Sequence, residues 1–296
     1  MGRGREGSVA GKLLITGAAG QLGQALVLSA ARQGWEAAAT DLPELDITDP
    51  QAVQGELSRR RPEVVINAAA ATRVDDLESD PDAALRVNAL GPRNLAVACR
   101  RLGIKLIHLS TDYVFDGAKL GPYVEWDRTA PLSVYGRSKL LGEEWVRQQC
   151  PDHFIVRTAW LYGVPGPNFV TAILARGRQL GPDGELKVVH DQRGTPTSAL
   201  ALAPQLLALA ATEAFGTYHA TCQGETTWYE FARLILKTAG ITVRVTPCTT
   251  AEFPRPAPRP ANSVLENRLL RVAGLDLMPA WQAAYRQFWE VYGDRL

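Results

Sequence analysis

The chain has 296 residues, of which 46% are hydrophobic and 21% are charged, and its formal net charge is +1. This composition is typical of globular proteins, and the length suffices for one large domain or two modest ones. A nearly neutral chain gives no reason to expect a nucleic-acid or membrane surface, and no segment approaches the roughly 20 apolar residues of a membrane span. We therefore expect a cytoplasmic protein with no nucleic-acid partner and no membrane partner.

The N-terminal residues, the cysteines and the histidines carry no targeting, disulfide or metal-binding pattern. Residues 1–11 are polar and rich in Gly and Arg, so we expect a disordered lead-in rather than a signal peptide. The four cysteines are widely spaced and the four histidines are isolated. This pattern favours free thiols in a reducing compartment over disulfides, and it predicts no metal site.

From residue 12 to about residue 157, short apolar segments alternate with stretches of helical periodicity. The expected strands are Leu13–Thr16, Glu36–Thr40, Val64–Asn67, Leu106–Leu109 and Phe154–Arg157. The expected helices are Leu22–Gln33, Pro50–Arg60, Pro81–Leu102 and Ser133–Gln149. This alternation predicts right-handed βαβ units and a parallel sheet covered on both faces, which is a Rossmann-like, doubly wound α/β fold.

Beyond about Ala159 glycines and prolines become more frequent and the alternation weakens. We expect one further strand and three further helices, at Leu186–His190, Ala199–Ala211, Trp228–Thr238 and Ala280–Tyr292. The proline-rich Phe253–Pro260 suits neither a central strand nor a helix interior, so it is expected to be an ordered loop. The predicted division is a dinucleotide-binding domain at 12–160 and a smaller α/β substrate-binding part at 161–296, some segments of which return to the core.

A glycine-rich turn joins the first expected strand to the first expected helix. Gly17, Gly20 and Gly23 follow the pattern G-x-x-G-x-x-G. Glycines there permit a tight turn and a close approach of the backbone to a pyrophosphate, whose charge the helix N-terminus stabilises. Gly/Ala-rich turns are common, but this position between strand and helix favours dinucleotide binding.

Residues after the second and third expected strands extend this dinucleotide site. Asp41 can accept hydrogen bonds from the adenosine ribose and repel a 2′-phosphate, which favours NADH over NADPH. A turn or helix-cap aspartate is the alternative. Asp46 and Ile47 are candidates to flank the adenine. The small residues of Asn67–Ala70 can let a cofactor lie close to the sheet edge, or can simply pack helix against strand.

The chemistry is expected after the fourth strand and on the following helix. Tyr135 and Lys139 lie one turn apart on one helix face, where the ammonium group can lower the pKa of the phenol for general acid–base work. A hydroxyl in Ser110–Asp112 could polarise a substrate carbonyl, although turns at strand ends often carry such residues. Trp160 is a candidate substrate wall, whereas Trp228 and Trp281 are expected to be packing residues.

With these residues in place, the chain resembles the extended short-chain dehydrogenases/reductases, and within them the dTDP-4-dehydrorhamnose reductase family. The motifs are the Gly17 turn, Asn67–Ala70, Ser110–Asp116, Pro131–Gly136, Tyr135-x-x-x-Lys139, Arg157–Tyr162, Asp191–Thr197, Thr226–Tyr229 and Arg259–Ser263. The resemblance implies NADH- or NADPH-dependent reduction of the C4 keto group of dTDP-4-dehydro-L-rhamnose, with Thr111, Tyr135 and Lys139 as the catalytic residues. It implies substrate contacts by Thr111, Asp112 and Trp160.

The same resemblance, with the glycine turn, gives the expected dinucleotide contacts. They are Gly17, Gly20, Gln21, Leu22, Gly23, Asp41, Asp46, Ile47, Ala70, Ala71, Thr72, Leu109, Tyr135 and Lys139.

The chain departs from the family pattern at two places, and two other functions are alternatives to the reductase. Ala71 stands where the family usually has an aromatic residue or His. By the same resemblance, Ala25 and Leu200 stand where some members have glutamates for a magnesium ion at a dimer interface, so we expect a monomer or a weak homodimer. The alternatives are a nucleotide-sugar epimerase or dehydratase of the same superfamily, and a non-catalytic dinucleotide-binding regulatory subunit.

Overall fold

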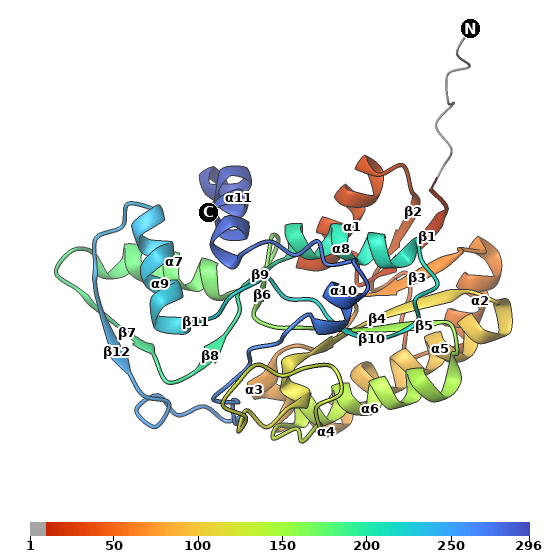
Figure 1. The fold of residues 1–296 in the computed structure, drawn as a ribbon, viewed down its shortest axis with the longest axis horizontal. Coiled ribbons are helices and arrows are strands. Elements are labelled where there is room, and N and C mark those ends of the chain that lie inside the picture. The colour runs from red at the N-terminus through yellow and green to blue at the C-terminus, as the bar shows by residue number, and fades with distance from the viewer. Residues whose placement is uncertain (1–9) are drawn as a thin grey trace, which may run out of the picture.

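A computed structural model describes residues 10–296 (Figure 1), and its centre is a six-stranded parallel sheet. The strand order is β10-β5-β4-β3-β1-β2. The strands are β1 (Lys12–Thr16), β2 (Glu36–Thr40), β3 (Val64–Asn67), β4 (Lys105–Thr111), β5 (His153–Thr158) and β10 (Gly216–His219). The five strands expected from the sequence are confirmed. The sixth, β10, was not predicted because it is a short edge strand with little apolar sequence.

Helices cover both faces of this sheet, so the doubly wound fold is confirmed. In β1, Leu13 and Ile15 pack into a core with α1 (Gln21–Arg32) and α8 (Ala199–Ala210). Leu14 points to the other face, where it packs with α2 (Pro50–Arg60) and α5 (Gly91–Leu102). Figure 1 shows α1 and α8 above the strands and α5 and α6 (Val134–Gln149) below them. A strand buried on both faces needs consecutive apolar residues, which is why these strands were recognisable.

The single helix expected at Pro81–Leu102 is wrong in one respect. The structure has α4 (Pro81–Leu85), a π-helical turn η1 (Arg86–Leu90) and then α5. Pro92 has no N–H to offer the carbonyl of Asn88, which therefore cannot take its usual helical bond. Gly142 of α6 lies against this carbonyl, and a Cβ there would be 2.2 Å from the oxygen. The lack of a side chain at Gly142 therefore lets α6 approach the π-turn closely.

The C-terminal half adds a smaller α/β part at one end of the sheet (Figure 1). Its strands β7 (Glu185–Val189) and β12 (Arg244–Cys248) pair in parallel and pack with α7 (Phe169–Leu180) and α9 (Trp228–Thr238). The remaining elements are α3 (Val74–Leu77), η2 (Asp112–Val114), β6 (Leu161–Tyr162), β8 (Arg193–Gly194), β9 (Thr197–Ser198), β11 (Thr226–Thr227), α10 (Arg268–Val272), α11 (Trp281–Tyr292) and η3 (Gly293–Arg295). Helix α7 and strand β12 were not predicted.

Segments from both halves of the chain build the main sheet and its cover. Strand β10 and helix α8 both come after residue 160. Strand β10 nevertheless pairs with β5 of the main sheet, and α8 packs on α1. The expected lead-in at 1–11 lies outside the described residues except for its last two. Ala10 N–H donates to Gly34 O at 3.0 Å and Gly11 O accepts from Glu36 N–H at 3.0 Å. Among residues 10–296, no helix combines the length and apolar character needed to cross a membrane.

Candidate active site

The glycine turn after β1 has the geometry that a bound pyrophosphate needs. Gly17 has φ +69°, and a Cβ there would lie 2.5 Å from the backbone nitrogen of Ala69. A Cβ on Gly23 would lie 2.3 Å from the carbonyl oxygen of Gly17. Gly20 caps α1 without a side chain, so the N–H groups of the first turn, including those of Gln21 and Leu22, remain available to an anion. These residues therefore fit a dinucleotide.

Asp41 is fastened to this turn. One carboxylate oxygen accepts from the N–H of Ala19 and the other from the N–H of Leu42, both at 2.8 Å. Asp46 is exposed and accepts from the N–H of Thr48, while Ile47 is buried in the core against Gly91. Asp41 thus lies beside the glycine turn, and Ile47 is mainly a packing residue.

The side chain of Asn88 makes two hydrogen bonds to the backbone of the loop after β3. Its side-chain oxygen accepts from the N–H of Ala71 at 2.9 Å, and its amide donates to Ala71 O at 3.0 Å. Ala70 and Ala71 are half-buried and Thr72 is exposed. Asn88 was missed by the sequence analysis because its position in the π-turn depends on the packing of α6.

Thr111, Tyr135 and Lys139 converge at the carboxyl end of β4. Ser133 caps α6, accepting from the N–H of Gly136 at 3.1 Å, and so sets where Tyr135 begins the helix. Thr111 is the last residue of β4, close to the phenol of Tyr135, and its hydroxyl donates to the Asp112 carboxylate at 3.0 Å. Lys139, one turn further along α6, is buried and donates to the carbonyl of Leu109 at 2.5 Å.

The prediction that Lys139 lowers the pKa of Tyr135 is wrong for this structure. Burial raises the pKa of Tyr135 to about 12, the nearby Thr111 hydroxyl opposes this shift, and the Asp112 carboxylate adds to it. Burial lowers the pKa of Lys139 to about 8, while Glu143 opposes the shift. At neutral pH Tyr135 is therefore a protonated phenol, which is the state that can donate a proton.

A buried ion pair lies directly behind these residues and was not recognised in the sequence. Glu143, one turn after Lys139, accepts from Arg157 at 2.8 Å and 2.7 Å and from Arg147 at 2.7 Å. Ser110 donates to the same carboxylate at 2.6 Å. Ser110 is thus engaged away from the site, and Thr111 is the hydroxyl that faces Tyr135. An Arg in an otherwise apolar strand was the available signal, because a buried charge needs a partner.

Asp112 is also buried in this site. One carboxylate oxygen accepts from the Thr111 hydroxyl at 3.0 Å, and the other has no hydrogen-bond partner among the described residues. Burial raises the pKa of Asp112 to about 6, although the nearby hydroxyls of Ser263 and Thr111 oppose the shift. A buried, unpartnered carboxylate oxygen next to Tyr135 is suited to accept a hydrogen bond from a ligand hydroxyl.

A cavity of about 970 Å³ lies next to this site, in the C-terminal part. Its aromatic lining residues are Tyr113, Trp160, Phe169, Trp228 and Phe253. Its charged lining residues are Arg176, Lys187, Arg255 and Arg259, against the single acid Glu185. Aromatic rings with an excess of cations suit a ligand that has a base and phosphates.

Trp160 is held in this cavity wall by a strained backbone and a stacked partner. It has φ +47°, and its ring stacks on Trp228 with a centroid distance of 3.4 Å and an interplanar angle of 8°. Trp228, expected to be only a packing residue, therefore also lines the cavity. Trp281 is buried in the core, as expected.

We expect Gly194→Ala to weaken ligand binding in this cavity. A Cβ at Gly194 would lie 2.3 Å from the ring of Trp160, which cannot move away without displacing Trp228. The expected result is a rise of about tenfold in the KM for the cavity ligand, since tilting two stacked rings costs on the order of 1 kcal/mol. Gly55→Ala is the control, because a Cβ there meets nothing within 4 Å. An unchanged KM in the Gly194 variant would contradict a binding role for the Trp160 ring.

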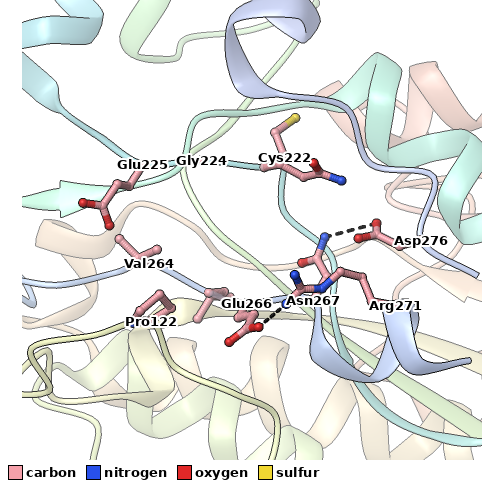
Figure 2. A pocket seen from close by; sticks show the side chains of 11 residues that line it. Pro122, Cys222, Gly224, Glu225, Val264, Glu266, Asn267, Arg271 and Asp276 are labelled. Carbon is pink, nitrogen blue, oxygen red and sulfur yellow. Dashed lines mark hydrogen bonds and ion pairs between the residues drawn. The ribbon is translucent and has the colours of Figure 1, made fainter.

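Figure 2 shows a second, smaller cavity of about 380 Å³. Its acids already have partners within the protein: Glu225 pairs with Arg193, Glu266 pairs with Arg271, and Asp276 accepts from Asn267. None of the site residues predicted from the sequence lines it. The larger cavity is therefore the one that continues the Tyr135 site.

Comparisons with known proteins agree with this geometry. A family model described as the RmlD substrate binding domain matches residues 11–293. The dTDP-4-dehydrorhamnose reductase of Streptomyces griseus is 45% identical over 278 residues, which cover 92% of this chain and 90% of that protein.

Two crystal structures have the same fold over almost their whole length. The dTDP-4-dehydrorhamnose reductase of Clostridium acetobutylicum has a TM-score of 0.92 at 45% identity, covering 95% of this chain and 99% of that one. The Bacillus anthracis enzyme of the same name, solved in complex with NADP, has a TM-score of 0.91 at 39% identity, covering 94% and 98%. This chain belongs to the RmlD substrate binding domain family, the oxidoreductase family of the dTDP-4-dehydrorhamnose reductases.

Proposed function

We propose that this protein reduces the C4 keto group of dTDP-4-dehydro-L-rhamnose to give dTDP-L-rhamnose, with NADH or NADPH as the reductant. The observation that carries the proposal is the position of Tyr135. It lies between an uncapped helix N-terminus suited to a dinucleotide and an aromatic, cationic cavity suited to a sugar nucleotide. The likeness of the whole chain to reductases of that name supports the choice of substrate.

Each catalytic residue has a distinct role in this reduction. A reduced nicotinamide dinucleotide, when bound, supplies the hydride to C4. Tyr135 donates its proton to the carbonyl oxygen, which becomes the C4 hydroxyl. Thr111, at the end of β4, donates a hydrogen bond to the same carbonyl oxygen and helps to polarise it alongside Tyr135. Lys139 is fixed by its bond to Leu109 O, and its ammonium group binds the ribose of the nicotinamide.

The dinucleotide is held by residues of the N-terminal half. The proposed contacts are Gly17, Gly20, Gln21, Leu22, Gly23, Asp41, Asp46, Ile47, Ala70, Ala71, Thr72 and Leu109, with Tyr135 and Lys139 near the nicotinamide. Asp41 favours NADH, because a carboxylate beside the glycine turn repels a 2′-phosphate. The Bacillus anthracis relative was solved in complex with NADP, and the test therefore compares the two dinucleotides directly.

The sugar nucleotide occupies the cavity of about 970 Å³. We propose that Asp112 accepts a hydrogen bond from a sugar hydroxyl and that Trp160 forms a wall against the sugar. The cations of the cavity neutralise the diphosphate, and its aromatic rings contact the base. In this arrangement 12–160 is the dinucleotide-binding domain, and 161–296 is mainly substrate-binding. We propose a cytoplasmic monomer or weak homodimer that requires no metal.

The test is oxidation of NADH and of NADPH in the presence of dTDP-4-dehydro-L-rhamnose, followed at 340 nm. We expect turnover with NADH at the higher kcat/KM and dTDP-L-rhamnose as the product by chromatography. Absence of turnover with both dinucleotides would exclude the reductase. Conversion of the sugar nucleotide without net oxidation of the dinucleotide would instead indicate an epimerase or a dehydratase.

A further inference from the structure

The proline-rich segment Phe253–Pro260, here called the strap, forms one wall of the sugar-nucleotide cavity. Prolines occupy every second position from 254 to 260. Proline has no N–H, so the strap has few donors with which to pair to a strand or close a turn of its own. Most of its residues are exposed, yet Ala257 is only 1% exposed. Something outside the strap must therefore hold its middle in place.

That holding group is Asp75. Its carboxylate accepts from the N–H of Ala257 at 3.2 Å and from the guanidinium of Arg259 at 2.6 Å and 2.9 Å. Arg255 lies 3.7 Å from the same carboxylate. The bidentate bond to Arg259 holds the pKa of Asp75 below its ordinary value, although burial opposes this. One side chain thus binds three residues of the strap.

Asp75 comes from the opposite side of the site. It lies on α3, directly after the loop that carries Ala71 and Thr72 on the dinucleotide side. At the other end of the contact, Arg259 lines the cavity together with Tyr113. The ring of Tyr113 lies edge-on to that of Tyr135, with a centroid distance of 5.4 Å. The Asp75–Arg259 pair therefore joins the two halves across the cavity that they enclose.

We propose that Asp75 is a positioning residue that fixes the strap as the closed wall of the sugar-nucleotide cavity. This inference rests on the proposed function, because it concerns the same substrate. Asp75 lies outside the lining of the cavity and acts through Arg259 and Ala257. Without Asp75 the strap loses its central contact. Substrate binding must then also order the strap, and this ordering cost lowers the affinity for the substrate.

The test is Asp75→Asn, which keeps the shape of the side chain but removes its charge. We expect the KM for dTDP-4-dehydro-L-rhamnose to rise about tenfold, as lost charge-assisted hydrogen bonds predict. The Kd for NADH, measured by fluorescence without the sugar nucleotide, and the kcat should stay within about twofold of the wild type. Arg259→Lys should raise the KM similarly, and the double variant should be little worse than either single variant.

Asp76→Asn is the matched control, because Asp76 lies on the same helix in an exposed pair with Arg73 at 3.2 Å. Calorimetry with dTDP gives a readout that does not depend on turnover: its Kd should rise in Asp75→Asn and not in the control. If the wild type binds dTDP and the Asp75 variant binds it equally well, the positioning role is overturned whatever the activity. Equal losses of NADH and dTDP binding would also overturn it, since they indicate a general structural defect. If the wild type fails to turn over but the dTDP result holds, only the proposed reaction fails.

Discussion

Replacing Tyr135 by Phe should lower kcat by about 10²–10⁴-fold, which is the usual contribution of a general acid. The phenol lies beside Thr111 at the end of β4, and its raised pKa keeps it protonated at neutral pH. The Phe ring fills the same volume, so the Kd for NADH should change little. The measurement is single-turnover oxidation of NADH with dTDP-4-dehydro-L-rhamnose, which isolates the chemical step.

Tyr292→Phe is the control for this experiment. Tyr292 is buried at the end of α11, in the core and away from the site, and removal of its hydroxyl should leave kcat unchanged. Turnover by the Tyr135 variant at the wild-type rate would remove Tyr135 from the role of acid. In that case Asp112, whose pKa burial raises to about 6, would be the next group to test.

Replacing Glu143 by Ala should lower the free energy of unfolding by about 3–5 kcal/mol, the cost of leaving a buried partner charge uncompensated. Glu143 is fully buried, and Arg157, with its side chain 3% exposed, would lose its bidentate partner. Ser110 would lose its acceptor at the end of β4. The measurement is equilibrium unfolding in urea, and the control is Glu144→Ala at the neighbouring, exposed position.

The pH dependence of this difference has a definite sign. Burial alone would raise the pKa of Glu143, but Arg157, Ser110 and Arg147 together lower it below its ordinary value of 4.5. The unfolded state therefore binds the proton more readily, and the stabilisation is complete above that ordinary value. It should be lost as the pH falls below 4.5 towards the lowered pKa of the folded state. A gap between wild type and variant that widens on acidification would contradict this account.

Much of the N-terminal half was predictable because its signals are local. Val64–Asn67 is a continuous apolar strand, and it was found with its observed bounds. The glycine turn was found because Gly17 must adopt a positive φ, which favours glycine in any context. Tyr135 and Lys139 were found because their spacing on a helix brings them to one face.

The missed elements lack such signals. Strand β10 is half polar and gains its place only by pairing with β5 at the sheet edge. The π-turn at Arg86–Leu90 packs against Gly142, which lies on another helix, and no local pattern marks that contact. Trp228 looked like a packing residue because its stacking partner, Trp160, is far away in the sequence.

The sequence by itself predicted the doubly wound fold and the dinucleotide turn, since these depend on residues close together in the chain, and its resemblance to the reductase family implied the three proposed catalytic residues. Only the tertiary structure decided how those residues are tuned and enclosed. The raised pKa of Tyr135 is an effect of burial, and burial is decided by the whole fold. The anchoring of the strap depends on Asp75 and Arg259, which are 184 residues apart. Contacts of that kind leave no periodic pattern in the sequence, because they are made by two side chains that only folding brings together.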